Sequence, residues 1–237
     1  MVYVTADLHG YPLDKFKELL ARAEFSSDDF LFVLGDVIDR GKDGVRLLSW
    51  MLYQPNVQLI LGNHEAMLLS CDFLFDELSE EALDNLDSNK MRLLGNWSLN
   101  GSDPTLESFK RISPELRADI LDYIREAPLY DSVSAGGRDF LLVHGGLGGY
   151  RPDKKLREYT DHELLWTRPT LTDRYSTEFT TILGHTPTCC YGESYKGRLF
   201  NNGTWINIDT GSACGYAPML LRLDDMKEFY GEIPEKA

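Results

Sequence analysis

The stretch FLFVLGDVIDRG, residues 30–41, runs five apolar side chains into a glycine and then places two aspartates three positions apart, followed at once by an arginine. An apolar run of β-forming residues that stops at a polar turn is typical of a buried strand. Glycine and aspartate are also ordinary turn formers, so this cluster alone fits a solvated turn as well as one part of a functional site. The rest of the chain has to decide between the two.

Four other segments share this design of an apolar run that ends in a glycine-containing turn: VYVTADLHG (2–10), VQLILGNHE (57–65), DFLLVHGG (139–146) and TTILGHT (180–186). Helical patterns with one apolar face separate the first three strands, over residues 12–24 and 43–53. Strand and helix therefore alternate through the first 65 residues. This alternation predicts right-handed βαβ crossovers and a mostly parallel sheet in that part of the chain.

The middle of the chain, about residues 66–127, is acidic and helical in pattern. It includes the stretch 75–94 and a helix beginning at 113, where Ser113 can cap and Pro114 occupies the first helical position. Afterwards β character returns, and residues 204–213 and 217–225 are expected to form closing strands. Because no repeat, low-complexity tract or linker interrupts the chain, we predict a single domain, 1–237, with a helical insertion.

Composition narrows the class of protein. The chain has 237 residues, 43% of them hydrophobic and 26% charged, as in a soluble globular protein. Its 24 Lys and Arg against 38 Asp and Glu give a net charge of −14, which argues against nucleic acid or an anionic membrane as the main partner. A phosphorylated substrate stays possible, because bound cations can reverse the local field.

The sequence also bears on the location of the protein and on its cysteines. No run approaches the roughly 20 apolar residues of a membrane span, and the chain begins with a strand-like segment, so a cytoplasmic location is expected. The cysteines Cys71, Cys189, Cys190 and Cys214 form no CxxC pair, and we expect reduced thiols that lie mostly in the core or in strands. The sequence leaves the oligomeric state open.

Histidines gather at the ends of the five predicted strands. The chain has five histidines in all, and four of them lie in these turns. Three aspartates and one asparagine lie in the same turns, so that the whole set is His9, His64, His144, His185, Asp7, Asp36, Asp39 and Asn63. In open α/β sheets the turns at the carboxyl ends of the strands converge on one crevice. A turn or cap role is the default for each aspartate alone, but it does not explain all five turns together. His162 has no motif around it and is expected to be structural or exposed.

Imidazole nitrogens with Asp and Asn oxygens are ligands that suit Mn, Fe or Zn. So many such groups exceed what one catalytic ion with an open position can use, but they suit two ions that share a carboxylate. Two ions about 3.5–4 Å apart can activate water for an in-line phosphoryl displacement. Arg40 follows Asp39 directly, and a guanidinium forms bidentate hydrogen bonds with phosphate oxygens.

These motifs resemble those of a known family. DLHG (7–10), GDVIDRG (35–41) and GNHE (62–65) look like the three ordered signatures of the phosphoprotein phosphatase family of calcineurin-like metallophosphoesterases, and the likeness extends to HGG (144–146) and GHT (184–186). The compact length and LLWTRP (164–169) are similar to the bacterial and bacteriophage branch of serine/threonine protein phosphatases. Ala6 stands where the family usually has glycine, and only a slightly altered turn is expected from it.

The resemblance implies an α/β fold, a β-sandwich flanked by helices in α/β/β/α layers. It also implies roles for ten residues. Asp7 and His9 would bind one metal ion and Asn63, His144 and His185 the other, with Asp36 bridging the pair, which we expect to be Mn, with Fe or Zn as alternatives. His64 would be the general acid, oriented by Asp39, while Arg40 and Arg168 would hold the phosphoryl oxygens. Arg168 lies outside the short signatures and could also be a surface arginine, and Trp166 beside it is expected in the core.

The function implied is hydrolysis of phosphoserine and phosphothreonine in proteins, with phosphotyrosine as a further substrate, by direct attack of the water that bridges the metals. A rival within the same fold is a nucleotide phosphohydrolase of the symmetrical dinucleoside tetraphosphatase type. The Asp at position 39 favours the former, since the nucleotide enzymes often carry Asn there. A non-catalytic binding module on the same scaffold is a third reading, against which the complete set of site residues argues.

Overall fold

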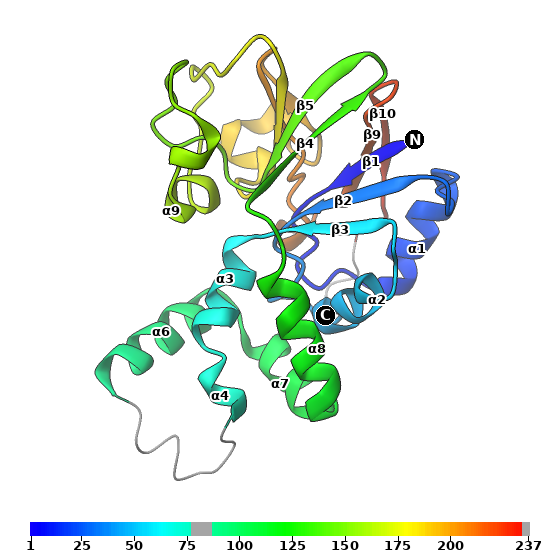
Figure 1. Ribbon diagram of the computed structural model, residues 1–237. Helices are drawn as coiled ribbons and strands as arrows, with labels where there is room; N and C mark the ends of the chain where they lie inside the picture. The colour runs from blue at the N-terminus through cyan, green and yellow to red at the C-terminus, as the bar shows by residue number, and fades with distance from the viewer. Residues whose placement is uncertain (77–86, 234–237) are drawn as a thin grey trace.

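The computed structural model describes residues 1–76 and 87–233 (Figure 1). Its first sheet has five strands in the order β10-β9-β1-β2-β3. The parallel core of this sheet consists of β1 (Val2–Thr5), β2 (Phe30–Leu34) and β3 (Val57–Ile60), joined through α1 (Leu13–Arg22) and α2 (Gly44–Leu52). The predicted βαβ crossovers are therefore confirmed. Two antiparallel strands, β9 (Met219–Arg222) and β10 (Lys227–Tyr230), complete the sheet beside β1.

The second sheet has the order β4-β5-β6-β8-β7. Its central strands β5 (Arg138–Val143), β6 (Thr180–Leu183) and β8 (Trp205–Asn207) are parallel. The outer strands β4 (Tyr130–Ala135) and β7 (Phe200–Asn201) are antiparallel to their neighbours. The sequence did not predict β4, β7 or β10. All three are edge strands, which are commonly short or polar and so lack the apolar run that reveals a buried strand.

The two sheets pack face to face around an apolar layer to which both contribute, with Val4, Phe32 and Leu221 from the first sheet and Leu142 and Ile206 from the second. Helices cover the other face of the first sheet, where α1 and α2 bury a second apolar cluster (Figure 1). The outer face of the second sheet carries a thinner cover, made of α9 (Asp161–Leu165) and short 3-10 turns. The predicted α/β architecture of two sheets flanked by helices is confirmed.

Between β3 and β4 the chain is helical. The helices are α3 (Asn63–Ser70), α4 (Phe73–Asp76), α6 (Ser88–Leu99), α7 (Asp103–Arg111) and α8 (Pro114–Arg125). Ser113 caps α8 as predicted, because its Oγ accepts the Leu116 backbone N–H at 3.2 Å. Of the stretch 75–94 that was predicted to be helical, residues 77–86 lie outside the described residues. The helical region begins at Asn63, three residues before the predicted start of the insertion at about residue 66. The division into one domain with an insertion stays a prediction.

Three of the four cysteines lie where the sequence did not place them. Cys71 is buried, but Cys189 is only half-buried, and Cys190 and Cys214 are exposed in 3-10 turns. The expectation that the cysteines lie mostly in core or strands was therefore wrong, because the segments after β6 and β8 turn at once rather than continuing as strands.

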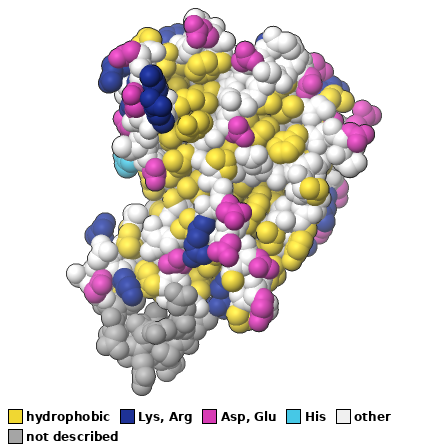
Figure 2. Space-filling view, viewed as in Figure 1, with side chains coloured by type: hydrophobic (Ala, Val, Ile, Leu, Met, Phe, Trp, Pro, Cys, Tyr) yellow, Lys and Arg dark blue, Asp and Glu magenta, His cyan; other side chains and the backbone are white. Residues whose placement is uncertain are grey.

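The surface shows mixed charge. On the face of the described residues seen in Figure 2, acidic side chains are spread among apolar and uncharged ones, and the Lys and Arg side chains do not merge into one patch. None of the helices in the described ranges is long and apolar enough to cross a membrane.

Candidate metal centre and active site

The strand-end turns of both sheets meet at one pocket of about 240 Å³. Turns after β1, β2 and β3 come from the first sheet, and turns after β5 and β6 come from the second. Seven of the ten predicted site residues line the pocket: His9, Asp36, Arg40, Asn63, His64, Arg168 and His185. The other three, Asp7, Asp39 and His144, are buried directly behind this lining. The structure thus brings the whole predicted set together.

The turns that carry these residues have an unusual backbone. Eight non-glycine residues in the described ranges have a positive φ, and six of them are predicted site residues: Asp7, His9, Asp36, Asp39, Arg40 and His185. Each such residue costs about 1–2 kcal/mol relative to an ordinary conformation. Such strain persists only where the surrounding structure enforces it, and it is concentrated at functional sites.

Two contacts enforce the turn after β2. The buried Glu65 carboxylate accepts the backbone N–H groups of Asp36 and Val37, both at 2.8 Å, and that of Ile38 at 3.3 Å. In addition, Gly10 and Gly41 pack backbone to backbone, so that a Cβ on Gly10 would lie 2.3 Å from the carbonyl carbon of Gly41. Only glycine permits the turns after β1 and β2 to approach this closely.

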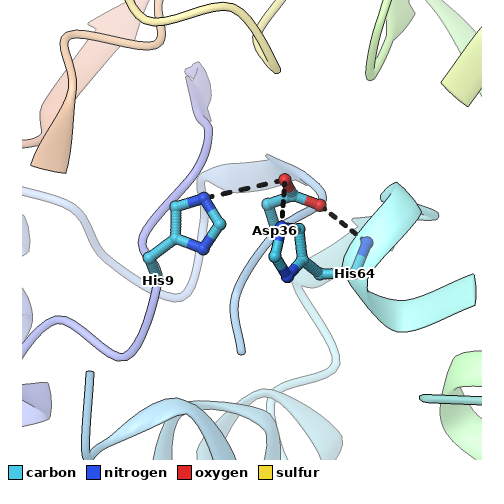
Figure 3. A group of neighbouring side chains, drawn as sticks. All are labelled: His9, Asp36 and His64. Carbon is cyan, nitrogen blue, oxygen red and sulfur yellow. Dashed lines mark hydrogen bonds and ion pairs between the residues drawn. The ribbon is translucent and has the colours of Figure 1, made fainter. Parts of the chain in front are cut away.

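Asp36 stands at the centre of the site (Figure 3). Its carboxylate oxygens lie 3.7 Å from His9 Nε2, 3.8 Å from His64 Nε2 and 3.4 Å from His144 Nε2. Two triads of side chains could each hold a metal ion, because the ligand atoms within each triad lie within 4.8 Å of one another. One triad is His9, Asp36 and His64, and the other is Asp36, His144 and His185. Burial opposes ionisation, but the four imidazoles around Asp36 outweigh it and hold its pKa well below the usual range. A carboxylate shared by two triads is consistent with a dinuclear metal site.

The imidazoles present unprotonated nitrogens to this carboxylate. His9 Nδ1 lies 3.1 Å from the Ile38 carbonyl and His144 Nδ1 lies 2.7 Å from the Leu34 carbonyl. Since a carbonyl oxygen only accepts, both Nδ1 atoms carry the proton. Both Nε2 atoms are therefore unprotonated and each offers a lone pair. Burial lowers the pKa of His9 to about 3 and that of His185 to about 2. Neutral imidazoles are the form that binds a metal ion.

Two features of the site suggest that a cation binds there. The buried His185 Nε2 has no hydrogen-bond partner among the described residues. His144 Nε2, a lone pair, lies 2.9 Å from the Asn63 side-chain oxygen, which is also an acceptor. Two acceptors that face each other repel unless the amide is turned round or a cation lies between them. The residues present therefore fit a pair of metal ions bound by nitrogen and oxygen ligands.

Asp7 lies at the same edge but is engaged differently. Its carboxylate oxygens accept the His185 backbone N–H at 2.9 and 3.1 Å, and it belongs to neither triad. Burial and the nearby Asp209 and Asp36 carboxylates raise its pKa well above the usual value. A cation beside Asp7 would relieve this repulsion, so its predicted ligand role stays a prediction that the geometry allows.

His64 has a dedicated partner. Its Nδ1 lies 2.6 Å from Asp39 Oδ2, and both side chains are buried. Burial by itself disfavours the charged ring, but the Asp36 and Asp39 carboxylates outweigh it and raise the pKa of His64. This direct contact supports the prediction that Asp39 orients His64. Because His64 also belongs to one triad, its geometry is compatible with a ligand role as well.

Two arginines lie on the pocket wall. Arg40 is exposed, and its Nη2 lies 3.2 Å from His64 Nε2. Arg168 donates from Nη1 to the His185 carbonyl at 2.9 Å and to Thr186 Oγ1 at 3.2 Å. Both retain free guanidinium donors, since each group has five N–H bonds in a fixed fork. Arg168 is also exposed, and it lines the pocket, so its predicted phosphoryl-binding role stays a prediction that this place in the structure allows.

Trp166 was expected in the core, and this expectation was wrong in part. The indole packs against the apolar cluster that α1 and α2 bury, but it is only half-buried and also lines the pocket. Its ring and that of His185 form a T-shaped pair with centroids 6.0 Å apart. The apolar pair before it is what suggested a core residue. His162 is exposed, as predicted, and stacks on Trp166.

Several residues of the site were not identified from the sequence. Asp209 lines the pocket, and burial together with the Asp36 carboxylate raises its pKa to about 7. It follows β8, which is parallel to β6, so the strand-end rule that identified the other turns could have found it. Trp97, Asn100 and Thr105, in contrast, reach the site from the α6–α7 region. No local signal in the sequence points to these three.

The comparisons with known proteins agree with this geometry. The family model of the calcineurin-like phosphoesterases matches residues 1–207. Serine/threonine-protein phosphatase 2 of Salmonella typhimurium is 28% identical over 221 residues, which cover 90% of this chain and 88% of that protein. A symmetrical bis(5'-nucleosyl)-tetraphosphatase of Acidovorax sp. is 31% identical over 148 residues, 62% of this chain but only 44% of the longer relative.

Solved structures share the fold at low identity. A candidate diadenosine tetraphosphatase superposes with a TM-score of 0.63 at 18% identity, covering 97% of this chain and 91% of that one. A cold-active protein-tyrosine phosphatase of a Shewanella species superposes with a TM-score of 0.56, also at 18% identity, covering 98% and 80%. With a family model that matches most of its length and two metal-binding triads at the expected turns, the chain belongs to the calcineurin-like phosphoesterase family.

Proposed function

We propose that this protein is a dinuclear metal-dependent phosphomonoesterase that hydrolyses phosphoserine and phosphothreonine in proteins, with phosphotyrosine as a further substrate. The observation that carries the proposal is the 2.6 Å contact between Asp39 and His64 at the pocket. Expulsion of a serine or threonine alkoxide requires a proton, and a positioned general acid contributes about 10²–10⁴ in rate. A nucleoside diphosphate is a far better leaving group and needs this assistance much less.

The residues of the centre divide the work between them. His9, Asp36, Asn63, His144 and His185, with Asp7, would hold two divalent cations, which we propose to be Mn, although Fe or Zn suits the same ligands. When bound, the cations would supply an activated water nucleophile and neutralise phosphoryl charge.

The remaining groups act on the substrate itself. Arg40 and Arg168 bind the phosphoryl oxygens and orient the ester, while His64 donates a proton from Nε2 to the leaving oxygen. Before substrate binds, Arg40 Nη2 faces His64 Nε2 at 3.2 Å, and a guanidinium can only donate, so this contact requires an unprotonated Nε2. Engagement of Arg40 by phosphate frees Nε2 to carry the proton.

The pocket size fits a substrate whose bulk remains outside. Its volume of about 240 Å³ lies below the range of roughly 300–1,000 Å³ of pockets that enclose a whole small ligand. A phosphoryl group with its ester oxygen fits, and the rest of a phosphopeptide lies across the surface. The alignment with a named serine/threonine phosphatase over 88% of that protein also supports this substrate class. Cytoplasmic location and protein substrates are part of the proposal.

A nucleotide phosphohydrolase is the second candidate. Similarity to the symmetrical tetraphosphatases favours it, at 31% identity over the 148 aligned residues. That alignment covers 62% of this chain and 44% of the relative, whereas the alignment with the serine/threonine phosphatase covers 90% of this chain and 88% of that protein.

The deciding experiment uses the full chain reconstituted with Mn²⁺. Phosphoserine, phosphothreonine and phosphotyrosine peptides are assayed beside diadenosine tetraphosphate, with His64→Asn and, as the matched control, His162→Asn, which changes an exposed histidine. We expect the phosphopeptides to give the higher kcat/KM and His64→Asn to lose activity on them by about 10²–10⁴. A preference for the dinucleotide would replace the proposal by its rival, and inactivity of the wild type on every phosphoester would end both.

A further inference from the structure

The buried Asp39 carboxylate has more partners than a residue that only turns a loop would need. Oδ2 accepts the indole N–H of Trp97 at 2.8 Å besides facing His64 Nδ1 at 2.6 Å. Oδ1 accepts the hydroxyl of Thr105 at 2.6 Å. All of these side chains are at most 2% exposed. A buried charge is costly unless donors satisfy it, and here three different elements supply them.

The direction of each of these hydrogen bonds is determined by chemistry. The indole N–H can only donate, so Trp97 fixes one acceptor site of Oδ2. The Thr105 hydroxyl accepts the Asp39 backbone N–H at 3.0 Å, and it therefore points its own proton at Oδ1. With both oxygens accepting, the carboxylate stays an acceptor toward His64, which must carry its proton on Nδ1. This leaves Nε2 to face the pocket.

Both donors come from the helical region between β3 and β4. Trp97 lies near the end of α6, and Thr105 lies in the first turns of α7. The same junction also holds the neighbouring arginine, since the Arg40 backbone N–H donates to the Gly101 carbonyl at 2.8 Å. The helices thus reach back to a turn that lies 58 to 66 residues earlier in the chain.

We propose that Trp97 and Thr105 are positioning residues, which hold the Asp39 carboxylate so that His64 presents Nε2 to the leaving group. The proposal rests on the general-acid role of His64 in the proposed function. It assigns to the α6–α7 junction the task of aligning the proton donor, rather than only that of covering the sheet. Neither residue contacts the metal triads, so metal binding is expected to be independent of both.

The test compares two substrates, one whose leaving group must be protonated as it departs and one whose leaving group departs without a proton. Thr105→Val removes the hydroxyl at nearly constant volume, Thr105→Ser restores it, and Trp97→Phe removes the indole N–H. Buried Thr181, whose hydroxyl has no partner among the described residues, gives the matched control Thr181→Val. Each Mn²⁺-loaded protein is assayed with p-nitrophenyl phosphate, a good leaving group, and with a phosphoserine peptide.

We expect Thr105→Val and Trp97→Phe to lower kcat on the phosphoserine peptide by about 10-fold or more, up to the 10²–10⁴-fold contribution of a positioned acid. KM and bound metal should change little, p-nitrophenyl phosphate should be hydrolysed at nearly the wild-type rate, and Thr105→Ser should recover most of the loss. Thr181→Val should resemble the wild type on both substrates. Equal losses on both substrates, or full activity of both variants, would overturn the inference.

A second measurement does not depend on activity. In the metal-free protein the short contact between His64 Nδ1 and Asp39 predicts a strongly downfield Nδ1 proton resonance in the ¹H NMR spectrum, which Thr105→Val should move upfield and Thr181→Val should leave in place. An unmoved resonance in a folded Thr105→Val protein counts against the inference. If the wild type hydrolyses no phosphoester, the proposed function fails, whereas the resonance still reports whether Thr105 orients the pair.

Discussion

At the scale of single residues, two aspartates that look alike in GDVIDRG have different surroundings. Asp36 lies among four imidazoles and belongs to both metal triads. Asp39, three positions later, touches none of these metal-facing groups except His64 and is enclosed by Trp97 and Thr105. The same carboxylate group can therefore bind metal in one position and orient a proton donor in the other.

Substituting each of the two aspartates by asparagine separates these roles. Asp36→Asn should weaken Mn²⁺ binding by at least about 100-fold, because loss of a shared charged ligand exceeds the usual 10–100-fold cost of changing an outer-shell partner. Asp39→Asn should bind Mn²⁺ normally and lose about 10²–10⁴ in kcat on alkyl phosphates. Metal content by mass spectrometry and steady-state kinetics measure both. Retained metal in Asp36→Asn, or lost metal in Asp39→Asn, would contradict the assignment.

Asp209 provides a pH-dependent test in the metal-free protein. Its pKa in the folded state is raised to about 7 from the ordinary 3.8, first by burial. The folded protein therefore binds this proton more tightly, so the carboxylate costs no stability below about pH 4, and the cost grows up to about pH 7. Asp209→Asn should raise the free energy of unfolding on the order of 2–4 kcal/mol at pH 8 and by much less at pH 4.5. Urea unfolding at both pH values measures this, and an equal gain at both would refute it.

At the scale of elements, α3 braces the turn that follows β2. Its residue Glu65 accepts three successive backbone N–H groups of that turn and is itself completely buried. Burial and the Asp36 carboxylate raise the pKa of Glu65 to about 7. The same helix begins at Asn63 and His64, so one short element carries two site residues and fixes the backbone of a third.

Glu65→Gln should therefore act through the backbone of the Asp36 turn. An amide offers one acceptor oxygen and brings an NH₂ group against backbone donors, which costs about 1–3 kcal/mol for each buried group left unpaired. We expect lower thermal stability and weaker metal binding together, measured by calorimetry with and without Mn²⁺. Glu115→Gln, at the exposed start of α8, is the control for the same chemical change. Unchanged stability in Glu65→Gln would show that the turn does not need this brace.

At the scale of the whole molecule, the active site joins the two sheets. Asp36 and His9 come from turns of the first sheet, and His144 and His185 come from turns of the second. Metal ions bound here would therefore link the two halves of the sandwich, and binding energy becomes stability of the folded state. The net charge of −14 adds repulsion that cations also reduce.

Metal binding should accordingly stabilise the entire fold. At 100 times its dissociation constant a ligand adds about 2.7 kcal/mol, which for a protein of this size raises Tm by about 5–10 °C. Differential scanning calorimetry over a range of Mn²⁺ concentrations measures the shift. Asp36→Asn should remove most of it, and the same shift in this variant would place the stabilising metal ions elsewhere.

The sequence by itself determined the turns at which the site is built and the chemical type of its residues. Parallel strands buried on both faces leave a strong local signal, and their carboxyl ends must converge, so the predicted site residues could be placed together without coordinates. Only the tertiary structure decided which residues from other segments complete the site. Trp97 and Thr105 reach Asp39 across 58 and 66 positions, and Trp166 lines the pocket while it also packs against the apolar cluster beneath the helices. Contacts of this kind depend on which helices pack against each other, and a single sequence shows the apolar face of a helix but not the partner of that face.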